Sequence, residues 1–141
     1  RVAALRDENP VADLSLYAYR DLTQISAMPY LKACTERNPV CIEALQELPE
    51  AALIQHIVAL PSESIYDDMG RLAQPDEVWN FGRGDGLEKA VLLATVLFAR
   101  TGAEIALDVY ADKAEFTHRG TTTTFATTKG LSPQTWTWPL A

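Results

Sequence analysis

The longest run of apolar residues lies between glycine turns near the middle of the chain. Residues Ala90–Ala99 are apolar except for Thr95, and the alternate glycines of Gly82–Gly86 lead directly into this run. Gly102 follows at the place where a helix would end. A long apolar run between such breakers is typical of a buried helix. Because this helix is apolar on nearly all sides, we expect neighbouring elements to cover most of it.

Before this run, prolines divide the chain into short segments with helical spacing. Pro29 is expected to interrupt a partly helical segment, Leu14–Met28, with a short helix resuming over Tyr30–Arg37. Asn38 and Pro39 are typical of a helix start, and this helix is expected to run through Leu45 to Leu48. The N-terminal half is therefore predicted to be mostly helical, and Arg1–Asn9 is predicted to be an irregular lead-in.

The next helix is predicted to begin with Pro49 in its first turn. Its apolar stripe consists of Leu53, Ile54, Ile57, Val58 and Leu60, and Pro61 ends it. Ser62–Gln74 is mixed in character and is predicted to be a loop that holds one helical turn. Val78–Phe81 is predicted to be a short approach to the glycine turn.

After Gly102 the pattern changes to alternation. Glu104–Tyr110, Ala114–His118 and the threonine-rich Thr121–Thr128 are predicted to be strands, and Leu131–Ala141 closes the chain with two tryptophans. Helices followed by an antiparallel β-meander indicate an α+β fold in which the central buried helix packs on the sheet.

Length and charge limit the function classes. The 141 residues suit a single domain, or a fragment of a larger protein. The net charge of −7, with no basic stripe, argues against nucleic-acid binding. No apolar run reaches the roughly 20 residues of a membrane span. The first residue is Arg1 rather than Met, which favours a processed, periplasmic or secreted protein, although an excised piece is equally consistent with it.

The segment Gly84–Leu93 resembles the nucleophile segment of bacterial transglutaminase-like domains, which belong to the papain-like cysteine protease superfamily. Those domains carry Gly-Asp-Cys, two further residues and then Lys-Ala before an aliphatic helix, and this chain has Gly-Asp-Gly, Leu-Glu and Lys-Ala. The match is specific over about ten residues and loose over Leu48–Tyr110. It implies a cysteine at the first turn of the helix, where the helix dipole favours the thiolate, acting with a His and an Asp from later strands.

The chain departs from that pattern at the reactive position, because Gly86 stands where the family has its cysteine. Glycine has no nucleophile, so no thioester can form there. His118 is the candidate remnant of the triad histidine, and no acid follows it at the tryptophan-containing end. Ordinary readings stay open: Gly86 as one more turn glycine, and His118 as an exposed histidine at a strand end.

We therefore predict a catalytically inactive transglutaminase-like domain that acts as a binding or structural module. Its partner is expected to be another polypeptide or a neighbouring domain. Trp79, Asp85, Gly86 and His118 are the predicted ligand-binding residues of the former cleft.

Two other functions stay open. A cysteine hydrolase or acyltransferase could use a displaced thiol, Cys34 or Cys41, although two ordinary thiols or a disulfide explain these residues equally well. A carbohydrate or small-molecule binder could use Trp136 and Trp138, which share one strand face; the plainer role for these rings is to cover the core.

We expect neither a metal nor a cofactor. The histidines and cysteines lack zinc-site spacing. The glycines follow a Gly-x-Gly-x-Gly order, which is neither the dinucleotide fingerprint nor a P-loop, and Asp85 would repel an anion. The tripeptide Arg83–Asp85 resembles an adhesion motif, but the longer match already accounts for it.

Overall fold

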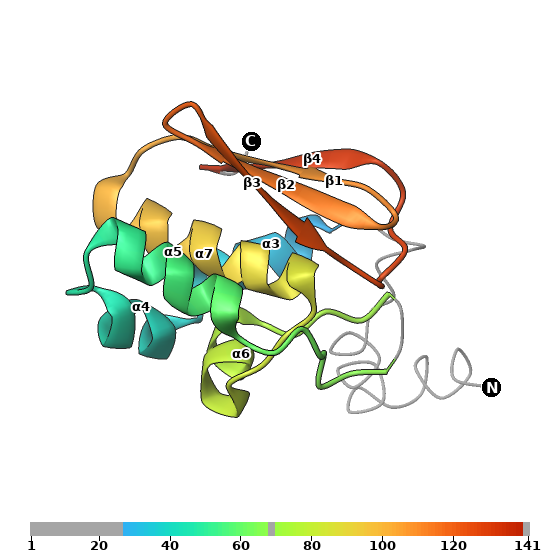
Figure 1. Ribbon diagram of the computed structural model, residues 1–141, viewed down its shortest axis with the longest axis horizontal. Helices are drawn as coiled ribbons and strands as arrows, with labels where there is room; N and C mark the ends of the chain where they lie inside the picture. The colour runs from blue at the N-terminus through green and yellow to red at the C-terminus, as the bar shows by residue number, and fades with distance from the viewer. Residues whose placement is uncertain (1–26, 68–69, 140–141) are drawn as a thin grey trace, which may run out of the picture.

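The computed structural model describes residues 27–67 and 70–139, and in these the chain is α+β. A layer of helices covers one face of an antiparallel sheet (Figure 1). The predicted segment Arg1–Asn9 and nearly all of Leu14–Met28 lie outside the described residues. The helices are α3 Met28–Glu36, α4 Pro39–Leu45, α5 Glu50–Ala59, α6 Pro75–Phe81 and α7 Gly86–Thr101, and the strands are β1 Ile105–Val109, β2 Lys113–His118, β3 Thr121–Ala126 and β4 Gln134–Trp138.

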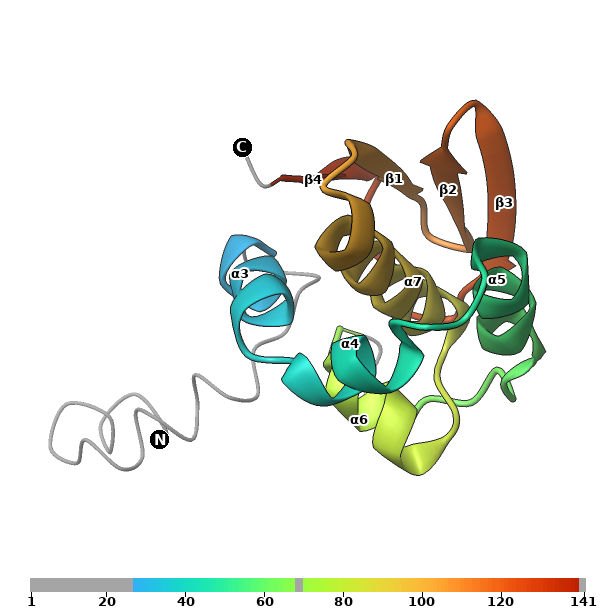
Figure 2. The same cartoon turned by 90° about the vertical axis from the view of Figure 1, so that its left-hand side faces the viewer.

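The predicted central helix is α7, and it contacts every other described helix and strand. All its residues from Gly86 to Leu97 are buried, as its nearly continuous apolar surface requires. Gly102 ends the helix in the left-handed conformation with φ 65°, which glycine adopts without steric cost. The prediction for this helix and both its ends is confirmed (Figure 2).

Pro29 and Pro49 both lie at helix starts, and this corrects two predictions. Pro29 does not interrupt a helix but lies in the first turn of α3, where a missing N–H costs nothing. Pro49 precedes the first turn of α5 as its N-cap residue. The segment Val78–Phe81, predicted as a short approach, is the second half of helix α6.

The predicted helical turn within Ser62–Gln74 is absent from the described parts of that segment, residues 62–67 and 70–74. Two of their backbone groups instead bond to buried side chains, one on α7 and one in the segment after β3. The amide of Ala73 donates to Glu88, and the carbonyl of Tyr66 accepts from Lys129. A helical turn would have used such groups internally, which explains why this stretch stays extended.

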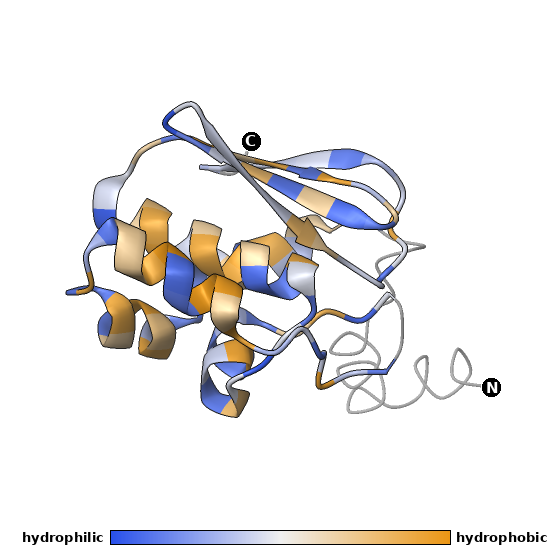
Figure 3. Cartoon of the chain, viewed as in Figure 1, coloured by the Kyte–Doolittle hydropathy of each residue, from blue (hydrophilic) through white to orange (hydrophobic). Residues whose placement is uncertain are grey.

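The sheet has the strand order β3-β2-β1-β4, with every pair antiparallel. β1, β2 and β3 form the predicted meander. β4 departs from it, because it crosses back to pair with β1, placing Trp138 opposite Ile105 and Trp136 opposite Leu107. Hydrophobic residues of α7 face this sheet (Figure 3).

The tryptophans of β4 lie in the core. This agrees with the second of their two predicted roles, which was to cover the core rather than to bind a sugar. Trp136 is 4% exposed and Trp138 is fully buried. Neither ring has a free face for a sugar to stack on in this structure. Within the described residues, no helix combines the length and apolarity that a membrane crossing needs.

Candidate functional site

The side chain of Asp85 joins the N-terminus of α7 to the segment that follows β3. It caps the helix by accepting a hydrogen bond from the Leu87 amide at 2.9 Å. It also accepts from the Thr128 amide at 2.9 Å and from the Thr127 hydroxyl. Asp85 is 3% exposed, so these donors replace the water that an ionised carboxylate would otherwise bind.

Glu88 lies one turn further along α7 and is completely buried. One carboxylate oxygen accepts from the Asp85 amide at 2.8 Å, which completes a capping box. The other accepts from the Ala73 amide at 2.7 Å and from the Ser64 hydroxyl at 2.8 Å. Burial raises the pKa of Glu88 above its ordinary value, and these hydrogen bonds and nearby Lys129 oppose that rise only in part.

Two buried lysines balance the two carboxylates. Lys89 donates to the carbonyls of Val58 and Leu60 at 3.1 and 2.9 Å, and burial lowers its pKa. Lys129 donates to the Tyr66 carbonyl at 3.0 Å and lies 3.9 Å from the nearer Glu88 oxygen. We call Asp85, Glu88, Lys89 and Lys129 the α7 polar network.

Gly86 lies against the backbone of β3. A Cβ atom placed on Gly86 would lie 1.8 Å from the Ala126 carbonyl oxygen and 2.8 Å from its carbon. Glycine is therefore required here by the close approach of a strand to the helix. The space that a side chain of residue 86 would occupy is filled by the main chain of Ala126.

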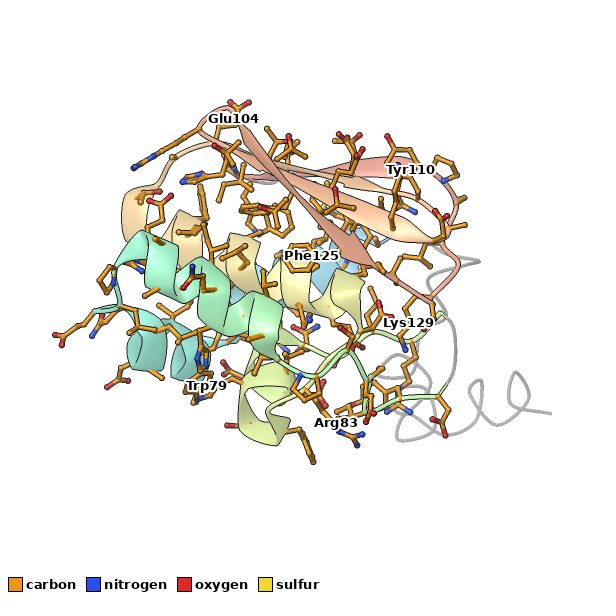
Figure 4. All side chains as sticks on the ribbon, viewed as in Figure 1. Trp79, Arg83, Glu104, Tyr110, Phe125 and Lys129 are labelled. Carbon is orange, nitrogen blue, oxygen red and sulfur yellow. The ribbon has the colours of Figure 1, made fainter. Side chains whose placement is uncertain are left out.

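A polar hollow of about 340 Å³ lies beside the α7 polar network. Figure 4 shows two of its basic residues, Arg83 and Lys129, near the N-terminal end of α7. Arg83 lies 3.5 Å from Glu63, so charges of both signs line it. Such a surface suits polar, hydrogen-bonding groups. The lining residues are Ser62, Glu63, Ser64, Tyr66, Asp67, Arg83, Thr128 and Lys129.

His118 lies at the opposite end of the β2–β3 hairpin from this site. It pairs with Thr121, whereas Ala126 pairs with Lys113, and the length of β3 separates the two positions by roughly 16 Å. The imidazole is 5% exposed, so it is not an exposed strand-end histidine. Its Nε2 lies 3.1 Å from a carboxylate oxygen of Glu50, but neither ring nitrogen makes a well-aligned hydrogen bond to a described residue.

The four predicted ligand-binding residues do not meet. Asp85 and Gly86 are adjacent, but Asp85 is occupied by its own hydrogen bonds and Gly86 is covered by β3. Trp79 lies on α6, with its ring centroid 5.8 Å from that of His56 (Figure 4). The structure therefore does not place His118 beside Asp85 and Gly86.

The two cysteines are separate, buried thiols. Both are free and fully buried, and burial raises the pKa of each well above the usual range for a thiol. Cys41 donates to the Asn38 carbonyl at 3.5 Å, and nearby Asp76 raises its pKa further. In the part of the chain that the structure describes, neither thiol bonds to an imidazole, and no metal-binding group of His, Cys, Asp and Glu occurs.

Sequence reasoning missed the α7 polar network. One signal was present, because Asp85 followed three residues later by Glu88 before an apolar run is a capping-box pattern. Lys129 gave no local signal, since its buried partner is far away in the sequence. The position of Glu50 beside His118 also gave no local signal, because the two residues are far apart in the sequence.

Comparisons with family models, curated proteins and solved structures find no match for this chain.

Replacing Gly86 with alanine tests the close approach of β3 to α7. We expect Gly86→Ala to lower the free energy of unfolding by about 3 kcal/mol or more, because backbone must move to admit the methyl group. The matched control is Gly82→Ala, where nothing lies within 4 Å and only the positive φ of 67° opposes the change; it should cost about 1–2 kcal/mol. Urea denaturation measures both, and a Gly86→Ala protein as stable as the control would contradict the packing.

The pKa of Glu88 makes stability depend on pH in a defined direction. Because the pKa of Glu88 is raised in the folded state, the folded protein holds the Glu88 proton more tightly than the unfolded chain does. This difference stabilises the folded protein at low pH, and the stabilisation is lost as pH rises above the ordinary pKa of 4.5. The unfolding free energy of the native protein should therefore fall, relative to Glu88→Gln, as pH rises from 4.5. The exposed Glu104→Gln is the control. A difference that stays constant over this range would refute the burial argument.

Proposed function

We propose that this chain is a catalytically inactive domain of transglutaminase-like type that acts as a binding or structural module, in contact with another polypeptide or a neighbouring domain. The observation that carries the proposal is the contact of Gly86 with β3. At the position that holds the nucleophile in the family that the sequence resembles, the chain has no side chain, and the Ala126 carbonyl fills the space.

The hydrogen bonds made by the backbone amides at the start of α7 also support a non-catalytic domain. In a thiol enzyme of this kind, backbone amides at the helix start favour the thiolate and the oxyanion. Here the Leu87 amide donates to Asp85, and the Asp85 amide donates to Glu88. Two backbone amides at this helix start are therefore used within the fold.

The displaced-thiol alternative finds no support in the arrangement of the cysteines. A reactive cysteine needs a lowered pKa and access to substrate. Cys34 and Cys41 have neither, since burial raises both pKa values and leaves no exposed sulfur. The carbohydrate alternative is also disfavoured, because the rings of Trp136 and Trp138 are enclosed in the core.

The architecture fits a rigid support. α7 is in contact with all the other described elements, and the α7 polar network fixes the segments on either side of it. A net charge of −7 favours partners that are neutral or basic.

An activity assay tests the absence of catalysis. We expect no incorporation of a fluorescent amine into a glutamine-containing peptide, and no hydrolysis of peptide substrates, with a known active transglutaminase as the positive control. Turnover that disappears in Cys34→Ser or in Cys41→Ser would overturn the proposal in favour of a displaced thiol. Turnover that persists in both variants would overturn it as well.

Thiol alkylation gives an independent test. At neutral pH we expect both cysteines of the folded protein to react with iodoacetamide far more slowly than in urea-unfolded protein, because the thiols are buried and their pKa values are raised. Mass spectrometry after proteolysis measures each site separately. Rapid labelling of one cysteine in the folded state would identify an activated thiol and contradict the assignment.

A further inference from the structure

The outer edge of β3 carries backbone groups that the sheet does not use. β3 is the first strand in the order β3-β2-β1-β4, so β2 covers only one of its sides. The hairpin turn contains just Arg119 and Gly120, with φ of 52° and 76°, and His118 pairs with Thr121 directly before and after it. In a hairpin with such a two-residue turn, the pair that closes the turn is hydrogen-bonded.

The alternation of an antiparallel ladder then assigns the remaining residues. Thr121, Thr123 and Phe125 bond to β2, whereas the N–H and C=O groups of Thr122, Thr124 and Ala126 point away from it. The hydroxyls of Thr117 and Thr122 lie 3.2 Å apart, as expected for a non-hydrogen-bonded pair with close side chains.

One of these outward residues is already covered, because the Ala126 carbonyl lies against Gly86. The free part of the edge is thus formed by Thr122 and Thr124. Neither makes a backbone hydrogen bond outside its own sheet to any residue of 27–67 or 70–139. Both residues are exposed.

The two edges of the sheet differ in protection. Proteins commonly guard edge strands with charge, proline or a bulge. β4 is bounded by Pro133 and Pro139, and its Trp136 packs against Tyr30 with ring centroids 6.3 Å apart. β3 has the sequence TTTTFA, without charge or proline, and pairs with β2 without a bulge. The threonines favour extended backbone.

From this geometry we propose that the edge of β3 at Thr122 and Thr124 binds an extended, net-basic polypeptide segment, which adds one strand to the sheet. The inference rests on the proposed function as a protein-binding module. Main-chain pairing would supply most of the binding energy, with side chains at alternate positions adding selectivity.

Charge decides between the possible occupants. A second copy of the chain would bring a net charge of −7 against −7, whereas a basic segment is attracted by the same field. The edge also lies above α5, at the margin of the helical layer (Figure 2).

Hydrogen exchange by NMR tests the site in the unaltered chain. The probe is a short acetylated and amidated peptide of alternating threonine and valine with a lysine at each end, and its fully N-methylated copy is the control. We expect the first peptide, and not the second, to slow exchange of the Thr122 and Thr124 amides. Protection confined to another surface, such as the polar hollow, or no protection at all would overturn the proposal.

Two variants separate main-chain pairing from side-chain contact. Thr124→Pro removes one outward N–H, so binding should weaken about tenfold, the value of one hydrogen bond. Thr124→Val keeps the N–H and the branched shape and should bind as the native chain does. Equal binding by both variants would contradict strand addition, and if Thr124→Pro does not fold, the exchange experiment decides alone.

Self-association is the third outcome. If protection of the Thr122 and Thr124 amides rises with protein concentration and without peptide, the occupant is a second copy, and the assignment to a basic segment is wrong. These results are independent of the enzymatic assay. Absence of binding leaves the non-catalytic assignment intact, and turnover would refute that assignment whatever the peptide does.

Discussion

The close approach of β3 to the start of α7 is the constraint on which the rest of the structure depends. It brings the Ala126 carbonyl against Gly86 and places the residues that follow β3 beside the Asp85 carboxylate. Only glycine permits this distance. With β3 in this place, the N-terminus of α7 is covered and the Thr127–Lys129 segment is fixed. Position 86, which holds the nucleophile in the family that the sequence resembles, then has no space for a side chain.

The α7 polar network stabilises this arrangement in a way that apolar packing alone would not. Buried charges are costly, and each of the four here is compensated by hydrogen bonds of defined direction. Glu88 binds the Ala73 amide and Lys89 binds carbonyls at the C-terminal end of α5, so a shift of either segment would leave a buried charge without its partner. We infer that the network selects one loop arrangement more than it adds to overall stability.

Local sequence signals predicted the parts of the fold that depend on local physics. The apolar run between glycines gave α7, alternation gave β1 to β3, and Pro39 marked the start of α4. Crossing of β4 to β1 was not predictable, because the alternation of a strand does not specify its neighbour. The pairing of Lys129 with Glu88 and the position of Glu50 beside His118 are likewise long-range contacts, which no periodicity records.

The central claim is that β3 occupies the space in front of Gly86, and a nuclear Overhauser spectrum measures this contact most directly. The structure predicts cross-peaks between the Gly86 α protons and protons of Ala126 and Thr127 in the folded protein. If these cross-peaks are missing while those between paired residues of β2 and β3 are present, the strand does not cover the helix start, and the account of a closed, non-catalytic site is wrong.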